Sequence, residues 1–210
     1  MVTERDMLTA LHQRYMNIRP GTISDRWVRA DHVANSLGTG GYVRFSRVCD
    51  FIAMDRYPGQ PYGTKLAIHG HEIKVNRSDW LKELREPEKA EAFIPYVHHW
   101  WLVAASKDIV KPGELPDGWG LMIPTKNGTL RAVKPSPRRD PEPLPLDLSI
   151  SIAQAAARTA HRESHHYDAP NTHLTRNGKV FIACGFCGEP APCPAHQPRE
   201  HTRHMVGSHT

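Results

Sequence analysis

Two segments of this chain have the composition of buried β-strands and yet place charged side chains on their apolar faces. They are residues 48–54 (VCDFIAM) and residues 65–75 (KLAIHGHEIKV). Because side chains alternate along a strand, Asp50 falls on an apolar face of the first segment, and Glu72 and Lys74 fall on an apolar face of the second. Burying an isolated charge is costly, so these groups need partners, and a divalent cation is an efficient one.

The surrounding sequence alternates helical and strand-like patterns. A helix is expected after Thr3, which forms a capping-box-like start with Asp6, another after Ser78 as N-cap, and a further one over residues 89–96. Additional strands are expected at residues 26–33, 42–48, 98–105, 120–124 and 129–133. This alternation predicts an α/β fold with a mixed sheet flanked by helices.

Three further positions are expected to serve packing. Trp100 and Trp101 are adjacent on a strand, so they should point to opposite faces of the sheet and pack in the core. Cys49 should be a small buried hydrophobe.

Composition divides the chain into three parts. Residues 1–133 have globular patterning and form the expected first domain. Residues 134–147 contain five prolines in fourteen positions, which predicts an extended linker over residues 134–148. Residues 149–210 begin with a helical pattern and continue into a tail rich in His, Pro and Cys.

The charged groups on the two central strands suit phosphodiester hydrolysis. Asp50 and Glu72 can bind a hard cation such as Mg²⁺ or Mn²⁺ through oxygen, and Lys74 can hold an ammonium beside the attacking water. Such a site also compensates for the charge that develops on the phosphate. A plain salt bridge on an edge strand is the alternative reading of the same three residues.

The pattern Asp50…Glu72-Ile73-Lys74 resembles the motif of the PD-(D/E)XK nucleases, which have a restriction-endonuclease-like fold. Its context (HGHEIKVNRSDWLKELREPEKAEAFIPYVHHWWLVA and PGELPDGWGLM) is similar to a group of small nuclease-like proteins of actinobacteria and their phages. The resemblance covers residues 3–133. Cys49 stands where many superfamily members have a proline, and that proline is dispensable across the superfamily.

The resemblance implies roles for individual residues. Asp50 and Glu72 would be metal ligands together with the carbonyl of Ile73, and Lys74 would position or deprotonate the water. Glu4 matches a helix glutamate that many members use to bind the metal or its waters, although it also complements the helix macrodipole. Candidate phosphate contacts are Lys89, Arg77 and His71, and for Lys89 and Arg77 a solvated helix face is the alternative.

The tail carries a second metal motif. Cys184, Cys187, Cys193 and His196 have the spacing C-x2-C-x5-C-x2-H, and three thiolates with one imidazole make a closed tetrahedral zinc set. The motif follows a β-like segment (KVFIA), and His201 or His204 could replace His196 as fourth ligand. A structural zinc module is therefore expected, and the alternative is a tail with free thiols.

Together these features predict an Mg²⁺-dependent deoxyribonuclease with DNA as partner. The formal net charge of +5 permits a polyanionic partner without demanding one. No apolar run is long enough to cross a bilayer, and the charged N-terminus is unlike a signal peptide, so the expected location is the cytoplasm of a bacterium or a phage-infected host. The alternative function is a nucleic-acid-binding or host-interaction module that keeps the nuclease fold with little or no activity.

Overall fold

A computed structural model describes residues 2–16, 26–37, 47–57, 65–167, 173–176 and 179–182, the side chains being described up to residue 160. The helices are α1 (Glu4–Arg14), α2 (Arg77–Arg85), α3 (Glu88–Glu91) and α4 (Leu146–Tyr167), with a 3₁₀ turn η1 (Ile94–Tyr96). The strands are β1 (Trp27–Ala34), β2 (Val48–Asp55), β3 (Ile68–Lys74), β4 (His99–Ala104), β5 (Trp119–Pro124), β6 (Leu130–Lys134), β7 (His173–Arg176) and β8 (Lys179–Ile182). The strand expected at residues 42–48 lies largely outside this description.

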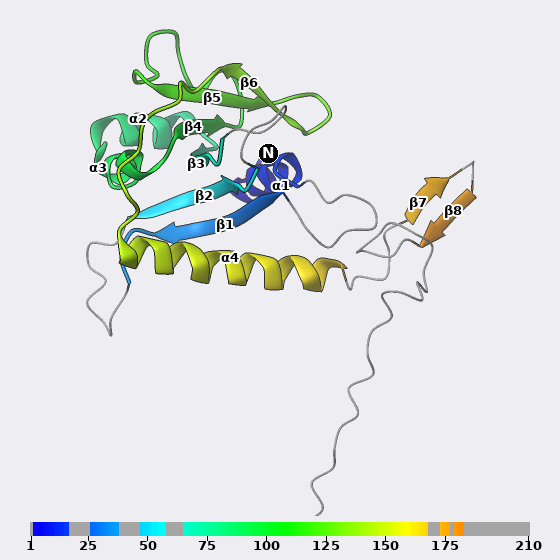
Figure 1. Ribbon diagram of the computed structural model, residues 1–210. Coiled ribbons are helices and arrows are strands. Elements are labelled where there is room, and N and C mark those ends of the chain that lie inside the picture. The colour runs from blue at the N-terminus through cyan, green and yellow to red at the C-terminus, as the bar shows by residue number, and fades with distance from the viewer. Residues whose placement is uncertain are drawn as a thin grey trace, which may run out of the picture.

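The first six strands form one mixed sheet in the order of the chain, β1-β2-β3-β4-β5-β6 (Figure 1). The three strands β1, β2 and β3 pair antiparallel, β4 and β5 continue parallel to β3, and β6 returns antiparallel to β5. The parallel connection between β3 and β4 contains α2, α3 and η1. A mixed sheet with flanking helices is the α/β architecture that the sequence predicted.

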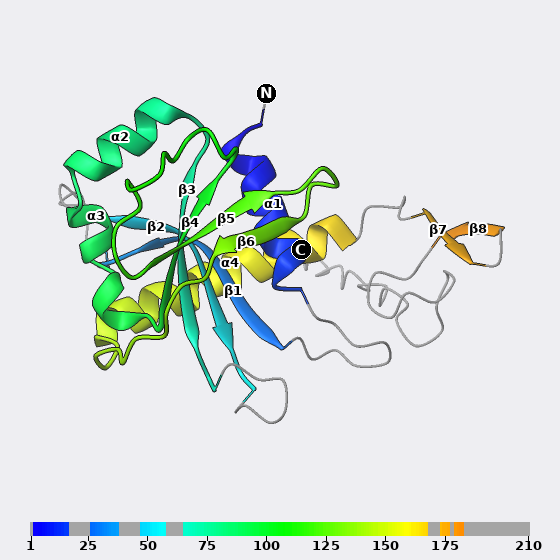
Figure 2. The ribbon, with the colours of Figure 1, turned by 90° about the horizontal axis from the view of Figure 1, so that it is seen from above.

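The two faces of the sheet carry different helices. One face of β3 carries its odd-numbered residues, and there Tyr15, just after α1, is hydrogen-bonded to His71. The other face carries the even-numbered residues, which Glu83 of α2 and Lys89 of α3 contact. Figure 2 shows α1 on one side of the sheet and α2 with α3 on the other. Because α2 and α3 lie on the even-numbered face, they cover the charged positions of β3.

The expected packing of Trp100 and Trp101 is confirmed, because both rings are buried on opposite faces. Trp100 lies across Gly70 of β3, where a Cβ atom would be 2.5 Å from the ring, and Trp101 lies equally close to Gly120 of β5. Only glycine leaves room for a ring at such a distance from the backbone. Cys49 is fully buried, as expected.

Helix boundaries agree with the sequence at α1 and differ from it at α2 and α3. Thr3 and Asp6 form the capping box, with the Asp6 amide donating to Thr3 Oγ1 at 3.2 Å. The prediction of Ser78 as N-cap of α2 is wrong, because Asn76 caps this helix and accepts from the Asp79 amide at 2.9 Å. The helix expected over residues 89–96 is broken into α3 and η1, since Pro95 has no amide to donate to the carbonyl of Glu91.

The proline-rich segment after β6 lies against the sheet, which corrects the expectation of a linker free of the first domain. Its Ser136 accepts from the amide of Trp100 at 3.1 Å, and Arg139 donates to the carbonyl of Gly118 at 2.7 Å. These bonds are possible because the extended segment leaves its polar groups free to pair with β4 and the loop before β5.

Helix α4 belongs to the same hydrophobic core as the sheet. It runs along β1 (Figure 1) and buries Leu148, Ile152 and Ala155. The hydroxyl of Thr159 also accepts from the amide of Asp31 at 3.2 Å and donates to the Asp31 carboxylate at 2.9 Å. A boundary at residue 133 therefore cuts through one core.

In the part of the chain that the structure describes, none of the helices combines the length and the apolar character that crossing a membrane requires.

A chain ending at residue 133 is expected to be less stable than one ending at residue 167. Burial of a Leu or Ile side chain contributes about 1.5–3 kcal/mol, so loss of Leu148 and Ile152 should lower the free energy of unfolding by roughly 3 kcal/mol or more. Urea denaturation of the two fragments measures this difference. Equal unfolding free energies would restore the boundary at residue 133.

Candidate functional site

Asp50 and Glu72 come together because β2 and β3 run in opposite directions. The pairs Ile52–Gly70 and Phe51–His71 fix the register, and one further step places Asp50 opposite Glu72 at the end of the pairing. There the carboxylate of Asp50 accepts the amide hydrogen of Ile73, with an N–O distance of 2.7 Å. Glu72 is fully buried and Asp50 almost so, although both are acidic.

Two lysines neutralise the carboxylates. Lys74 Nζ lies 2.5 Å from Glu72 Oε1 and 2.7 Å from Glu83 Oε2. Lys89 Nζ lies 2.5 Å from the same Glu72 oxygen and 3.6 Å from Asp50 Oδ1. The sequence prediction that Asp50, Glu72 and Lys74 converge is therefore confirmed in position, and Lys89 joins them.

Burial dominates the electrostatics of this cluster. It raises the pKa of Asp50 and, together with the neighbouring Asp50 charge, raises the pKa of Glu72 to about 7, while the two lysines act in the opposite direction. Burial opposes the charge of the Lys74 ammonium, but Glu72 and Glu83 outweigh it, so the pKa of Lys74 is raised. The pKa of Lys89 is raised in the same way by Glu72 and Asp50.

The cluster opens into two adjoining hollows. The smaller, of about 140 Å³, is lined by Asp50, Glu72 and Lys74 and by Glu4 at its rim. The larger, of about 270 Å³, shares Lys74, Asp79 and Lys89 with the first and adds Arg47, Lys82, Glu83 and Glu86. Both carboxylates thus lie beside space that a cation and a phosphate group could enter.

The donor atoms fit a hydrated magnesium ion. The second oxygen of Glu72, Oε2, is buried and has no hydrogen-bond partner among the described residues. Within these residues no three His, Cys, Asp or Glu side chains are grouped closely enough to hold a metal, so a cation here would have two carboxylates, Asp50 and Glu72, as its protein ligands. Mg²⁺ is commonly bound by one or two carboxylates and retains several waters, which matches a pair of this kind.

Glu4 lies at the rim and is not buried with the other acids. It occupies the first turn of α1, where its side chain is about half exposed, and its Oε1 lies 3.4 Å from His32 Nε2. Its place near the helix N-terminus also complements the macrodipole. Both roles expected from the sequence remain compatible with this position.

Of the three expected phosphate contacts, His71 is wrong because it is buried, and Arg77 is engaged in an ion pair within the protein. His71 is fully buried, its Nε2 lying 2.9 Å from the Tyr15 hydroxyl and its Nδ1 3.2 Å from the Phe51 carbonyl, so a phosphate cannot reach it. The odd parity of this residue places it on the face covered by α1. Arg77 pairs through both terminal nitrogens with Glu114 and donates to the carbonyl of Ile109 at 2.7 Å, which fixes the loop before β5.

Glu83 is a member of the cluster that the strand motif does not contain. The sequence of α2 could have predicted this, because Glu83 lies three residues after the apolar Trp80 and therefore on the same inward face of the helix. A buried carboxylate on that face requires a cation, and Lys74 supplies it.

The expected zinc ligands Cys184, Cys187, Cys193 and His196 lie outside the described residues. The β-like segment before them is confirmed, since β8 ends at Ile182 and pairs with β7 as an antiparallel hairpin.

No protein-family model matches this chain, and no curated protein matches it either. Among solved structures, the SPO1766 protein of unknown function from Silicibacter pomeroyi is similar to it over 72% of this chain and 86% of that chain, with 17% identity and a TM-score of 0.44.

Acid should destabilise the protein through its buried histidines. Burial lowers the pKa of His69 to about 2 and of His71 to about 3, whereas in the unfolded chain both protonate near pH 6.5. The free energy of unfolding should therefore be fully retained above about pH 6.5 and fall as the pH decreases toward 3, by up to about 1.4 kcal/mol per pH unit for each histidine.

Denaturation of wild type and His71→Gln between pH 4 and 8 checks this expectation. The free energy of unfolding of the variant should fall less steeply as the pH decreases, because unfolding takes up about one proton fewer than in wild type. This difference in slope does not depend on the stability of the variant at pH 8. Parallel curves would show that His71 does not carry the effect.

Proposed function

We propose that this chain is a divalent-metal-dependent deoxyribonuclease of the PD-(D/E)XK type, with a restriction-endonuclease-like core. The observation that carries the proposal is the meeting of Asp50, Glu72 and Lys74 in one buried cluster at the ends of β2 and β3, beside a hollow. Burying so many charges is unfavourable for stability alone, which favours a role in chemistry.

Asp50 and Glu72 would hold the metal, with the Ile73 carbonyl as a further oxygen donor. Mg²⁺ or Mn²⁺ held there would supply the positive charge that activates water and stabilises charge developing on the phosphate. The amide of Ile73 fixes the orientation of the Asp50 carboxylate, and burial excludes competing solvent from Glu72. These contacts preorganise the carboxylates before substrate arrives.

Lys74 would act as a fixed positive charge. Its ammonium is held between Glu72 and Glu83, and the raised pKa keeps it protonated near neutral pH. It can therefore donate to the attacking water or to a phosphate oxygen, and a group that stays protonated is poorly suited to removing a proton. Of the two roles expected from the motif, water positioning is the one we propose.

DNA is the proposed substrate because the adjoining hollow offers further cations beside the carboxylates. Arg47 and Lys82 line it together with Lys89, and the chain has a formal net charge of +5. Cationic side chains around a scissile phosphate position the backbone without reading sequence.

One observation favours the second candidate, a nucleic-acid-binding module without robust activity. Lys74 and Lys89 already neutralise Asp50 and Glu72 without any metal. If both ion pairs were permanent, the cluster would be a structural salt-bridge network, and any DNA held by the neighbouring cations would not be cleaved.

We also propose a structural zinc module in the tail, formed by Cys184, Cys187, Cys193 and His196. The support is their spacing and the β-hairpin that precedes them. Four ligands close a tetrahedral site and leave no open position for catalysis.

Substitution of the three central residues tests the nuclease proposal. Asp50→Ala and Glu72→Ala should abolish DNA cleavage and weaken Mg²⁺ binding, because each removes a ligand. Lys74→Ala should reduce the rate about 10²–10³-fold, the usual cost of one preorganised electrostatic group, while Mg²⁺ binding persists. Cleavage of linear, circular, single-stranded and branched DNA in Mg²⁺ and Mn²⁺ is the measurement.

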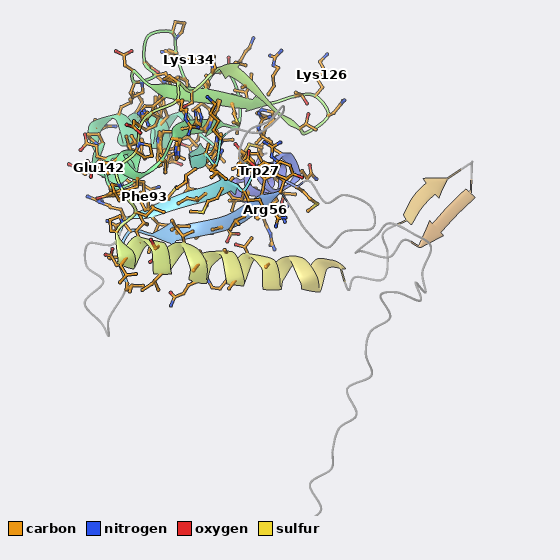
Figure 3. The ribbon with its side chains drawn as sticks, in the orientation of Figure 1. Trp27, Arg56, Phe93, Lys126, Lys134 and Glu142 are labelled. Carbon is orange, nitrogen blue, oxygen red and sulfur yellow. The ribbon has the colours of Figure 1, made fainter. Side chains whose placement is uncertain are left out.

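Two exposed residues serve as matched controls. Lys126→Ala removes a lysine at the tip of the β5–β6 hairpin, far from α3, and Glu142→Ala removes a carboxylate after β6 (Figure 3). Both should cleave like wild type. Equal cleavage by wild type and the Asp50 and Glu72 variants would refute the assignment of the site, and DNA binding without cleavage by wild type would favour the second candidate.

The zinc module makes a separate prediction. Protein purified without added metal should contain about one zinc ion per chain by elemental analysis, and Cys184→Ser should lower that content. A zinc content near zero in both proteins would remove the module.

A further inference from the structure

Lys89 occupies the place between the two acidic side chains where a cation would bind. Its Nζ contacts Glu72 Oε1 at 2.5 Å and approaches Asp50 Oδ1 at 3.6 Å. Lys74 touches Glu72 as well, but its second partner is Glu83. Lys89 is therefore the ammonium of this cluster that bridges both proposed metal ligands.

Lys74 and Lys89 differ in how firmly they are held. Lys74 lies within β3, its side chain is 10% exposed, and Glu83 anchors it from α2. Lys89 belongs to the four-residue helix α3, its side chain is 28% exposed, and its two ion-pair partners are Asp50 and Glu72. A long side chain at the mouth of a hollow can leave with little disturbance of the core.

Charge balance also selects Lys89. Within the ion-paired cluster, the three acids Asp50, Glu72 and Glu83 outnumber the two lysines by one charge when all five are ionised. Glu4 and Asp79 also line the smaller hollow, but both are exposed, so water screens their charge. A divalent cation added to all five groups would leave one excess positive charge in a buried cluster. The same cation replacing Lys89 makes the cluster neutral, which is the cheaper arrangement in a poorly solvated place.

We propose that Lys89 is an exchangeable internal counterion, which neutralises Asp50 and Glu72 in the absence of metal and leaves them when a divalent cation binds. The inference rests on the cation site of the proposed function. The displaced ammonium has a place to go, because Lys89 also lines the larger hollow, whose wall carries the acidic Asp79 and Glu86 beside Arg47 and Lys82. Cation loading would thus deliver a positive charge to the surface where a DNA phosphate is expected.

Amine acylation of the wild-type full-length protein tests the displacement directly. Lys89 should react slowly without divalent cation, because it is buried in two ion pairs, and several-fold faster in saturating Mg²⁺. Peptide mass spectrometry reports both rates, and the exposed Lys126 in the β5–β6 hairpin is the internal reference that should not change. Asp50→Ala, which lacks a ligand, should not show the Mg²⁺ effect. Unchanged Lys89 reactivity in wild type loaded with Mg²⁺ would overturn the inference.

Metal affinity gives an independent measurement. Lys89→Met removes the competing charge and keeps the length of the side chain, so Mg²⁺ should bind about tenfold or more tightly than to wild type, within the usual range for coupling between two sites. Lys126→Met, at the exposed tip of the β5–β6 hairpin and away from both hollows, should bind Mg²⁺ like wild type. Titration calorimetry measures both, and Lys89→Gln replaces the first variant if the apolar side chain prevents folding. Equal or weaker binding by the Lys89 variants would overturn the inference.

The two proposals fail in different ways. One outcome is that wild type binds Mg²⁺ through Asp50 while Mg²⁺ neither exposes Lys89 nor competes with it. In that case the exchange is wrong and the proposed nuclease site stands. If no protein in the series binds Mg²⁺, the cation site itself is wrong, and the exchange is wrong with it.

Discussion

The need to neutralise Glu72 organises the centre of this structure. A fully buried carboxylate is stable only with cations or donors beside it, and Lys74 of β3 and Lys89 of α3 supply them. Strand β2 brings Asp50, whose own charge adds to the demand, while β3, α2 and α3 bring Lys74, Glu83 and Lys89. The parallel crossover from β3 to β4 contains α2 and α3, which lie over these charges.

The strand pattern predicted the centre of the site and could not predict its surroundings. Alternation along residues 48–54 and 65–75 places Asp50, Glu72 and Lys74 correctly, since strand parity is a local property. The partnership of Lys74 with Glu83 depends on how α2 docks on the sheet, which no local pattern contains. His71 illustrates the opposite error, because its place near the end of the strand suggested a phosphate contact, whereas its side chain points to the face opposite that of Glu72.

The fold was predictable to the same depth. Apolar alternation gave the strands of the mixed sheet that the structure describes, and the capping box gave the start of α1. The proline-rich segment was misjudged because its proline content predicts an extended, stiff backbone and does not predict which residues that backbone contacts. Ser136 and Arg139 tie it to β4 and to the loop before β5, and these bonds join residues far apart in the sequence.

The attachment of α4 to β1 affects more than the size of the core. An edge strand presents unpaired amides and carbonyls to any other strand that approaches, and Thr159 takes up one such amide of β1 at Asp31. The opposite edge, β6, carries the exposed Arg131 and Lys134, whose charges discourage pairing with another chain. The two edges are thus guarded by different means, a helix on one side and charge on the other. Loss of α4, by proteolysis or a stop codon, would expose the edge of β1, to which a strand of another chain could pair. The shortened chain would then be prone to aggregate.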